Sequence, residues 1–265
     1  MITSTQNQVV KDIKALSRKK DRMKSGRFVA EGLRFVMSAI QMNAKIDAIV
    51  YSDAVYRTEE GTTFINELIE KAEYKVLEIE EKIFGELSDT QSPQGIMALV
   101  HQPKFTWEQI MKPHGFLIIL DRIQDPGNLG TIIRTADAAG ADGVILLKGT
   151  VDAYNPKVLR STMGSVFEMP VIEGVTWEET FNNLSEAGYT FAATALEKSV
   201  EYDSVDYTKS SALIIGNEAN GISDEIISQS DIAVKIPIVG SAESLNAGVA
   251  AAVMMYEVLR QRRKN

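Results

Sequence analysis

The chain has 265 residues, of which 45% are hydrophobic and 24% are charged, and its formal net charge is -8. These values are typical of a globular protein with one large domain or two smaller ones, and they exclude a disordered or fibrous chain. The sequence has no cysteine and two histidines, His101 and His114, so it offers no disulfide, thiolate metal site or thiol nucleophile, and we expect no metal.

The start of the sequence has no apolar signal region, and no apolar run approaches the ~20 residues of a membrane-spanning helix. We therefore expect a cytoplasmic protein with no membrane partner. The charges are unevenly distributed, because residues 1–27 hold eight basic and two acidic side chains. Such a basic end is compatible with nucleic-acid phosphates, and Lys19 and Arg22 are candidate RNA contacts. A solvated helix face explains the same cluster.

The first part of the chain alternates helix and strand patterns. Polar and basic residues with spaced apolar ones over residues 3–25 predict an exposed N-terminal helix. Strands are then expected over 27–31, 46–51, 75–78 and 95–100, and helices over 32–42, 62–72 and 80–87. These elements predict a small α/β domain over residues 1–103. A stretch with two prolines, residues 101–114, marks its end.

The second part of the chain, residues 114–265, begins with an apolar run at 116–120 that is typical of a buried parallel strand. A polar turn over 121–130, a helix over 131–139 and a strand over 144–147 complete a βαβ unit. Further strands are expected near Val171 and over 191–195, 212–215 and 233–238, with a helix over 177–187. Six strands with interleaved helices predict a mostly parallel sheet that is covered on both faces.

The segment from Ile236 to Asn246 joins the last predicted strand to a C-terminal helix. The strand is expected to run through Ile238, and Gly240 permits a sharp turn. A helix is expected from about Leu245, with apolar residues at helical spacing: Val249, Val253, Tyr256 and Leu259. A helix N-terminus after such a loop can hold a polar ligand, although a plain capped helix accounts for the same pattern.

Three polar loops follow predicted strands, at residues 121–134, 216–223 and 236–246. In an open α/β sheet, the loops at the carboxyl ends of parallel strands converge on one ligand crevice. The sequence has no G-x-G-x-x-G dinucleotide motif and no G-x-S-x-G nucleophile elbow, and Ile222 replaces the P-loop lysine. What remains is a site that holds two substrates in line and acts mainly by positioning them.

These loops contain the motifs D-P-G-N-L-G-T-I-I-R, I-G-N-E-A-N-G-I and I-P-I-V-G-S-A-E-S-L-N. Their order and spacing resemble the three motifs of the SpoU (TrmH-like) RNA ribose 2'-O-methyltransferases. The resemblance covers residues 115 to 260, and residues 27 to 100 are more weakly similar to the family's N-terminal substrate-binding domain. It implies a SPOUT-type fold with a C-terminal trefoil knot, a homodimer, S-adenosylmethionine as cofactor, and structured RNA as substrate, ribosomal rather than transfer RNA.

The resemblance also implies a set of site residues. The catalytic positions would be Arg134, Asn128, Glu218, Ser244 and Asn246. The cofactor would be held mainly by backbone around Gly216, Ile236 and Leu245, with Thr194 and Asn217 as neighbours. Arg160 is similar to a family position that faces RNA, although a surface salt bridge explains it as well.

The roles of these residues follow partly from their chemistry. The family treats Arg134 as a candidate base, but a guanidinium is almost never neutral, so stabilising the developing alkoxide is the physically cheaper role. Asn128 and Asn246 can donate and accept hydrogen bonds and so orient the ribose. Glu218 either fixes Arg134, or fixes the hydroxyl, or only caps a surface helix.

Three alternatives stay open on the sequence alone. The chain could be a non-catalytic RNA-binding protein with a vestigial cofactor site, or a small-molecule transferase that does not act on RNA. The C-terminal helix is either plain core or, as the resemblance suggests, part of a dimer interface that buries Val249, Val253 and Tyr256.

Overall fold

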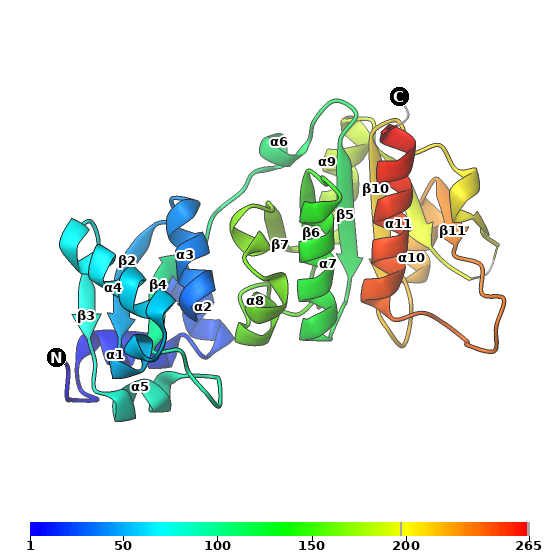
Figure 1. Cartoon of the computed structure of the whole chain (residues 1–265). Helices are drawn as coiled ribbons and strands as arrows, with labels where there is room; N and C mark the ends of the chain where they lie inside the picture. Colours follow the sequence, from blue (N-terminus) through cyan, green and yellow to red (C-terminus); the bar gives the residue numbers. More distant parts are fainter. Residues whose placement is uncertain (197, 264–265) are drawn as a thin grey trace. The chain divides into compact units, whose positions relative to one another are not determined.

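The computed structural model describes residues 1–196 and 198–263, which form two compact units (Figure 1). The first unit comprises Met1–Pro103 and Tyr154–Leu159, and the second comprises Lys104–Ala153 and the residues from Arg160 on. Over these described ranges, no helix has the length and apolar character needed to cross a membrane.

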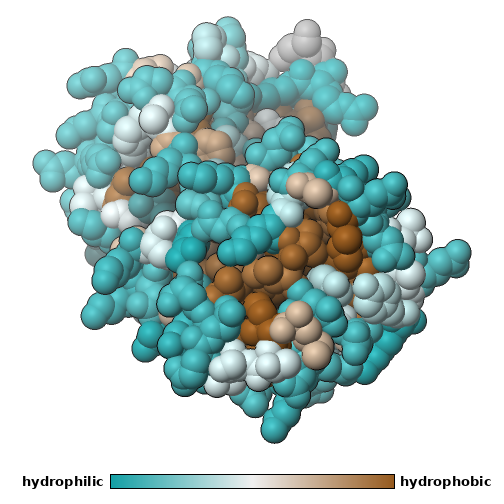
Figure 2. Space-filling view, turned by 90° about the vertical axis from the view of Figure 1, so that its left-hand side faces the viewer, coloured by the Kyte–Doolittle hydropathy of each residue, from teal (hydrophilic) through white to brown (hydrophobic). Residues whose placement is uncertain are grey.

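The first unit contains a four-stranded sheet with the strand order β1-β4-β2-β3 in the described residues. Its strands are β1 (Arg27–Glu31), β2 (Ile46–Tyr51), β3 (Val76–Glu78) and β4 (Ile96–His101). The helices after β1 are α3 (Leu33–Gln41), η1 (Asp53–Arg57), α4 (Glu59–Lys71) and α5 (Glu81–Leu87). Central β4 pairs antiparallel with β1 and β2, whereas edge strand β3 pairs parallel with β2. Figure 2 shows an apolar patch bordered by hydrophilic side chains on the side of this unit that faces the viewer.

The N-terminal segment differs from the single exposed helix that the sequence predicts. It forms two short helices, α1 (Gln8–Ala15) and α2 (Lys19–Ser25). Val10, Ile13 and Leu16 are buried against residues of α5, so the apolar stripe is part of the core and the prediction of an exposed helix is wrong.

Arg22 explains how the two helices are joined. Its side chain is only 2% exposed, and Nη1 donates to the carbonyl oxygens of Leu16 at 2.7 Å and Ser17 at 2.8 Å. These carbonyls lie at the end of α1, where helical partners are missing. We therefore assign Arg22 a structural role and correct the prediction that it contacts RNA, whereas Lys19 is exposed.

The second unit contains a seven-stranded sheet in the described residues, in the order β7-β6-β5-β10-β8-β11-β9. Its strands are β5 (Phe116–Asp121), β6 (Gly143–Leu147), β7 (Val171–Val175), β8 (Thr190–Thr194), β9 (Val200–Glu201), β10 (Ser211–Gly216) and β11 (Ile232–Lys235). All neighbouring strands pair in parallel, which confirms the predicted parallel sheet. The two-residue strand β9 was not predicted.

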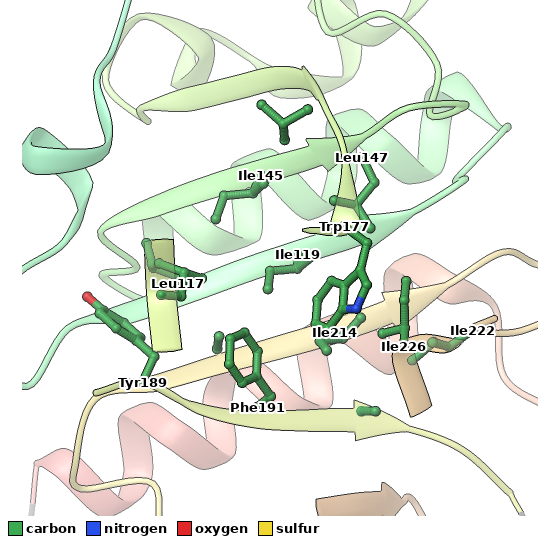
Figure 3. Packing of buried hydrophobic residues seen from close by; sticks show 14 of the residues in the cluster. Leu117, Ile119, Ile145, Leu147, Trp177, Tyr189, Phe191, Ile214, Ile222 and Ile226 are labelled. Atoms are coloured by element: carbon green, nitrogen blue, oxygen red, sulfur yellow. The ribbon is translucent and has the colours of Figure 1, made fainter. Parts of the chain in front are cut away.

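Helices cover both faces of this sheet. They are α6 (Trp107–Ile110), α7 (Pro126–Ala138), η2 (Ser165–Phe167), α9 (Trp177–Glu186), η3 (Tyr202–Ser204), α10 (Asp224–Gln229) and α11 (Ala247–Arg262). Helix α8 (Pro156–Thr162) is divided between the two units after Leu159. Figure 1 shows α7 and α11 on one face, and α9 and α10 on the other. On the α9 side, Leu117 and Ile119 of β5 pack with Trp177 and Phe191 (Figure 3). A central strand buried on both faces must be apolar throughout, as β5 is up to Asp121.

Several element boundaries differ from the predicted ones. Helix α7 begins at Pro126 rather than at residue 131, because the Asp125 side chain accepts from the backbone N–H of Asn128 at 2.7 Å and Pro126 fits the first helical turn. Strand β11 ends at Lys235 rather than at residue 238. Helix α11 begins at Ala247, after the N-cap Asn246, so Leu245 lies in the loop.

The predicted apolar stripe of α11 lies on its outer side. Val249 is 50% exposed and Tyr256 is 51% exposed. The buried stripe is instead formed by residues on the opposite side of the helix: Ala251, Met254, Met255 and Val258. The plain-core interpretation of Val249 and Tyr256 is therefore wrong for this chain taken alone.

Arg262 anchors the C-terminal end of α11. Its guanidinium donates to four backbone carbonyls, those of His114, Gly115, Tyr207 and Lys209, at 2.7 to 3.1 Å. It also lies over the Phe116 ring, 5.4 Å from the ring centroid. These carbonyls belong to the segments that precede β5 and β10, so Arg262 fixes the end of α11 against the central strands.

Replacing Arg262 by alanine should leave these carbonyls without their partner and lower the Tm of the second unit by about 5–10 °C. Tryptophan fluorescence reports on this unit, because both tryptophans, Trp107 and Trp177, lie in it. Arg263→Ala removes an exposed arginine next to it and serves as the control. Equal Tm values for the two variants would contradict the anchoring role.

Candidate active site

The three predicted loops leave the same edge of the parallel sheet. Strands β5 and β10 are neighbours, and Asp121 pairs with Gly216 at their carboxyl ends. The loops 122–125 and 217–223 therefore start side by side. The third loop, residues 236–246, follows β11 and leads back to α11, which packs against α7 and β10.

A single side chain connects all three loops. Asn128 is 9% exposed, and its side-chain amide donates through Nδ2 to Oε1 of Glu218 at 2.9 Å. Its Oδ1 accepts from Nδ2 of Asn246, also at 2.9 Å. The structure thus brings together three of the five predicted catalytic residues in one hydrogen-bonded network, which we call the Asn128 network.

Glu218 acts as an acceptor for the first loop. Besides Asn128, its carboxylate accepts from the backbone N–H groups of Gln124 and Asp125, each at 3.4 Å. Burial raises the pKa of Glu218, but these hydrogen bonds outweigh burial, and the net pKa lies below the ordinary value. Glu218 therefore stays ionised at neutral pH and is better suited to positioning the loop than to removing a proton.

Asn246 links the network to α11. Its Oδ1 caps the helix by accepting from the N–H groups of Gly248 at 3.0 Å and Val249 at 3.3 Å. The same side chain donates to Asn128, so both polar atoms are used. The start of α11 is thereby fixed to the start of α7.

The second loop is shaped by Gly216 and Asn217. A Cβ atom at Gly216 would lie 2.3 Å from the backbone carbon of Gly221, so only glycine fits there. The Asn217 side chain donates to the carbonyl of Arg122 at 2.8 Å and accepts from the N–H groups of Ala219 and Asn220. Both residues hold the turn that carries Glu218.

Arg134 and Ser244 lie outside this network. Arg134 is exposed on α7, and within residues 1–196 and 198–263 its side chain makes no hydrogen bond or ion pair. Ser244 is exposed in the third loop. The interpretation that Glu218 fixes Arg134 is therefore corrected, because the carboxylate is bound to Asn128 and to the backbone instead. A free guanidinium at this position is available to a substrate.

The predicted cofactor residues lie at the same edge of the sheet. Thr194 ends β8, and its hydroxyl donates to the carbonyl of Ile214 at 3.0 Å. Ile236 is half-buried and Leu245 is 39% exposed. Among the described residues, the backbone of 236–245 has no hydrogen-bond partner. Free N–H and C=O groups beside apolar side chains fit a nucleoside-type cofactor held by backbone.

The remaining predicted residues are not part of the Asn128 network. Arg160 is exposed on α8 and Lys19 is exposed on α2. In the described parts of the chain, no group of three His, Cys, Asp or Glu residues could hold a metal ion. Sequence reasoning missed Gln124 and Asp125, although an aspartate followed by proline is a known helix-start signal that would have indicated Asp125.

Comparisons with known proteins identify the family. Residues 115–256 match the SpoU rRNA Methylase family, and residues 7–98 match the MRM3-like substrate binding domain. The chain belongs to the SpoU methylase family. The expected SPOUT-type α/β fold is thereby confirmed, and the trefoil knot is implied by that fold.

Members of this family resemble the chain over nearly its whole length. The chain is 36% identical over 257 residues to the 23S rRNA (guanosine(2553)-2'-O)-methyltransferase RlmP of Bacillus subtilis, and the matched region covers 97% of this chain and 98% of the relative. The AdoMet-bound rRNA methyltransferase from Sinorhizobium meliloti is 36% identical, with a TM-score of 0.86 and coverage of 98% and 97%. The SpoU methyltransferase AviRb from Streptomyces viridochromogenes, in complex with AdoMet, is 28% identical, with a TM-score of 0.88 and coverage of 98% and 100%.

The Asn128 network of this SpoU family member can be tested by Asn128→Asp, which places a second carboxylate beside Glu218. At pH 7.5 we expect a Tm about 5 °C below that of Asn128→Ala, because the amide that donates to Glu218 is replaced by a carboxylate that repels it. At pH 5.5 the difference in Tm between the two variants should narrow, since repulsion raises the pKa of one carboxyl and allows it to take up a proton.

The wild type supplies the control. The pKa of Glu218 lies below its ordinary value of 4.5, so the stabilisation by its charge is present above that value and is lost only at lower pH. Titration of Glu218 should therefore not change the wild-type Tm between pH 7.5 and 5.5. A gap between Asn128→Asp and Asn128→Ala that does not depend on pH would contradict the network.

Proposed function

We propose that this protein is an S-adenosylmethionine-dependent methyltransferase that modifies a ribose 2'-hydroxyl of structured RNA, and that its substrate is ribosomal RNA. The observation that carries the proposal is the Asn128 network, which joins the three SpoU motifs at one edge of the sheet. The whole-length similarity to RlmP supports the reaction and the class of RNA. The two AdoMet-bound relatives support the cofactor. An enzyme that acts on ribosomal RNA would work in the cytoplasm.

The residues of the site have separable roles in this reaction. When bound, S-adenosylmethionine supplies an electrophilic methyl group, which is transferred to the ribose oxygen as the carbon–sulfur bond breaks and the hydroxyl proton is lost. Backbone groups around Gly216, Ile236 and Leu245 would hold the cofactor, with Thr194 and Asn217 as neighbours. Asn128, Glu218 and Asn246 keep the three loops in fixed positions relative to one another. Ser244 is exposed and is available to either substrate.

Arg134 is the side chain best placed to contact the ribose or its phosphate. It has no partner among the described residues, and its guanidinium can donate two parallel hydrogen bonds. A guanidinium is not a practical base at neutral pH, so we assign it the stabilisation of negative charge on the 2'-oxygen. The proton then passes to solvent or to the RNA itself.

The first unit would bind the RNA outside the reacting nucleotide. Residues 7–98 match a domain described as substrate binding. Lys19 is exposed on α2, and the neighbouring acidic residue Asp21 is paired with Arg18 at 2.6 Å. In the second unit, Arg160 is an exposed cation at the end of α8. We keep Lys19 and Arg160 as RNA contacts on this basis.

The alternative of a non-catalytic RNA-binding protein is not favoured, because the catalytic motif residues are all present and three of them form one network. A thermal-shift measurement separates the two functions without RNA. S-adenosylmethionine should raise the Tm of an enzyme with an intact site, by mass action, and should leave that of a vestigial protein unchanged.

The central experiment uses purified protein, methyl-labelled S-adenosylmethionine and in vitro transcribed 23S rRNA. We expect label in alkali-resistant dinucleotides, because a 2'-O-methyl group blocks cleavage at that position. Arg134→Ala should lower kcat by about 100–1000-fold through loss of charge stabilisation, with cofactor affinity unchanged. Arg134→Lys should recover little, since one ammonium does not replace the planar fork. Unchanged kcat in Arg134→Ala would remove Arg134 from this role.

We also propose that the protein is a homodimer through the outer side of α11. Val249 and Tyr256 are each about half exposed there. Apolar side chains at helical spacing on one exposed helix side are suited to contact with a second copy.

Light scattering after size exclusion tests the dimer. The wild type should elute with the mass of two chains, and Val249→Lys should shift it toward the monomer by placing a charge on this exposed apolar side of α11. Met23→Lys, which alters a 68% exposed apolar residue of the first unit, should remain dimeric. A monomeric wild type at every concentration tested would refute the proposal.

A further inference from the structure

Arg122, which directly follows β5, has an unusual backbone conformation. Its φ of 57° places it in the left-handed region. Side chains with a Cβ are disfavoured in this region, whereas glycine enters it freely. Because glycine would adopt this backbone conformation at a lower energy cost, we expect the arginine side chain to have a function that glycine could not supply.

The guanidinium of Arg122 is held in place by a buried carboxylate. Its Nε and Nη2 atoms donate to the two Asp121 oxygens, each at 2.8 Å. The side chain of Asp121 is 5% exposed, whereas that of Arg122 is 40% exposed. Nη1 of Arg122 has no acceptor among the described residues. Two of the three guanidinium nitrogens are thus held by Asp121, and Nη1 remains available to another acceptor.

A second cation follows the neighbouring strand. Strands β5 and β6 are parallel, with Leu120 paired to Leu146, so Arg122 and Lys148 leave the sheet at equivalent positions. Lys148 is exposed and has no ion-pair partner in the described chain. Gly149 lies against the Arg122 side chain, because a Cβ there would be 3.0 Å from Cγ of Arg122.

These two cations adjoin the candidate active site. The Arg122 carbonyl accepts from Nδ2 of Asn217 at 2.8 Å, and Asn217 immediately precedes Glu218. A guanidinium already fixed by a carboxylate can bind a phosphate with little further loss of side-chain freedom. If the reacting nucleotide binds at the Asn128 network, as the proposed function requires, an anion bound by Arg122 would lie near it.

We propose that Arg122 and Lys148 together bind the RNA backbone phosphate next to the methylated nucleotide, and that the Asp121 carboxylate fixes the orientation of the Arg122 guanidinium. The proposal rests on the proposed RNA methyltransferase function and adds a contact within it. Asp121 also accepts from the backbone N–H of Ser223 at 3.0 Å. A purely structural role for Arg122 would lower the Tm of a variant without changing its affinity for RNA.

The test uses Arg122→Gly in the full chain. Glycine relieves the left-handed backbone but leaves the buried Asp121 carboxylate with only the Ser223 N–H as a partner among the described residues, so the Tm should fall by a few degrees, and affinity for S-adenosylmethionine should be unchanged. The KM for in vitro transcribed 23S rRNA should rise about tenfold with little change in kcat, because the variant lacks one charge-assisted hydrogen bond to the RNA. Lys148→Ser should act in the same direction.

Salt dependence gives a second readout that requires no methyl transfer. In filter binding, the slope of log affinity against log salt should decrease by about 0.7–0.9 for each RNA phosphate that the variant no longer neutralises. Lys209→Ser is the matched control, because Lys209 is exposed before β10, at the opposite edge of the same sheet. Its KM and its salt slope should equal those of the wild type.

Two results would overturn the proposal. An unchanged KM and salt slope for Arg122→Gly, with an active wild type, would show that the side chain does not bind RNA. A lower Tm together with abolished cofactor binding would show that the arginine is structural. Failure of the proposed function is a different outcome, in which the wild type transfers no methyl group while filter binding still reports on the two cations.

Discussion

The site depends on one amide group, that of Asn128. Loops that follow different parallel strands have no reason to keep a fixed spacing unless something joins them, and here one side chain donates to Glu218 and accepts from Asn246. Each contact uses a different atom of the amide, so an isosteric carboxylate cannot replace it. Because Asn128 is only 9% exposed, water cannot replace a hydrogen bond that its side chain fails to make, and the missing bond lowers the stability of the folded protein. The network therefore specifies one arrangement of the three loops.

The packing of the second unit places this amide. The apolar strand β5 is buried by helices on both faces, which fixes where Asp121 leaves the sheet, and the Asp125 cap then starts α7 so that Asn128 falls in its first turn. At the other end of the chain, Arg262 fastens α11 to the segments before β5 and β10, and Asn246 caps its start. Core, caps and anchor together hold the candidate site on rigid elements, and the exposed Arg134 lies on one of them.

The sequence predicts the longer strands and the parallel sheet, and it brings Asn128, Glu218 and Asn246 to notice, because apolar runs and loop composition are local signals. It was not sufficient where tertiary packing decides. Arg22 lies in a basic segment that is typical of a surface, yet the carbonyls at the end of α1 draw its side chain inward. For α11 the sequence leaves open whether Val249 and Tyr256 belong to the core or to an interface, and packing decides that the smaller Ala251 faces the core while these two residues stay half exposed. The hydrogen-bond partners in the site, the left-handed backbone conformation of Arg122 and the knot produce no periodic pattern in the sequence, so periodicity could not predict them.

The most direct measurement of the central claim is a double-mutant cycle on kcat/KM for RNA methylation, with Asn128→Ala, Asn246→Ala and the double variant. If one amide network holds the loops together, the second substitution should cost much less once the first is present, giving a coupling of about 1–2 kcal/mol. Additive effects, with the two reductions simply multiplying in the double variant, would show that Asn128 and Asn246 act independently and would contradict the account.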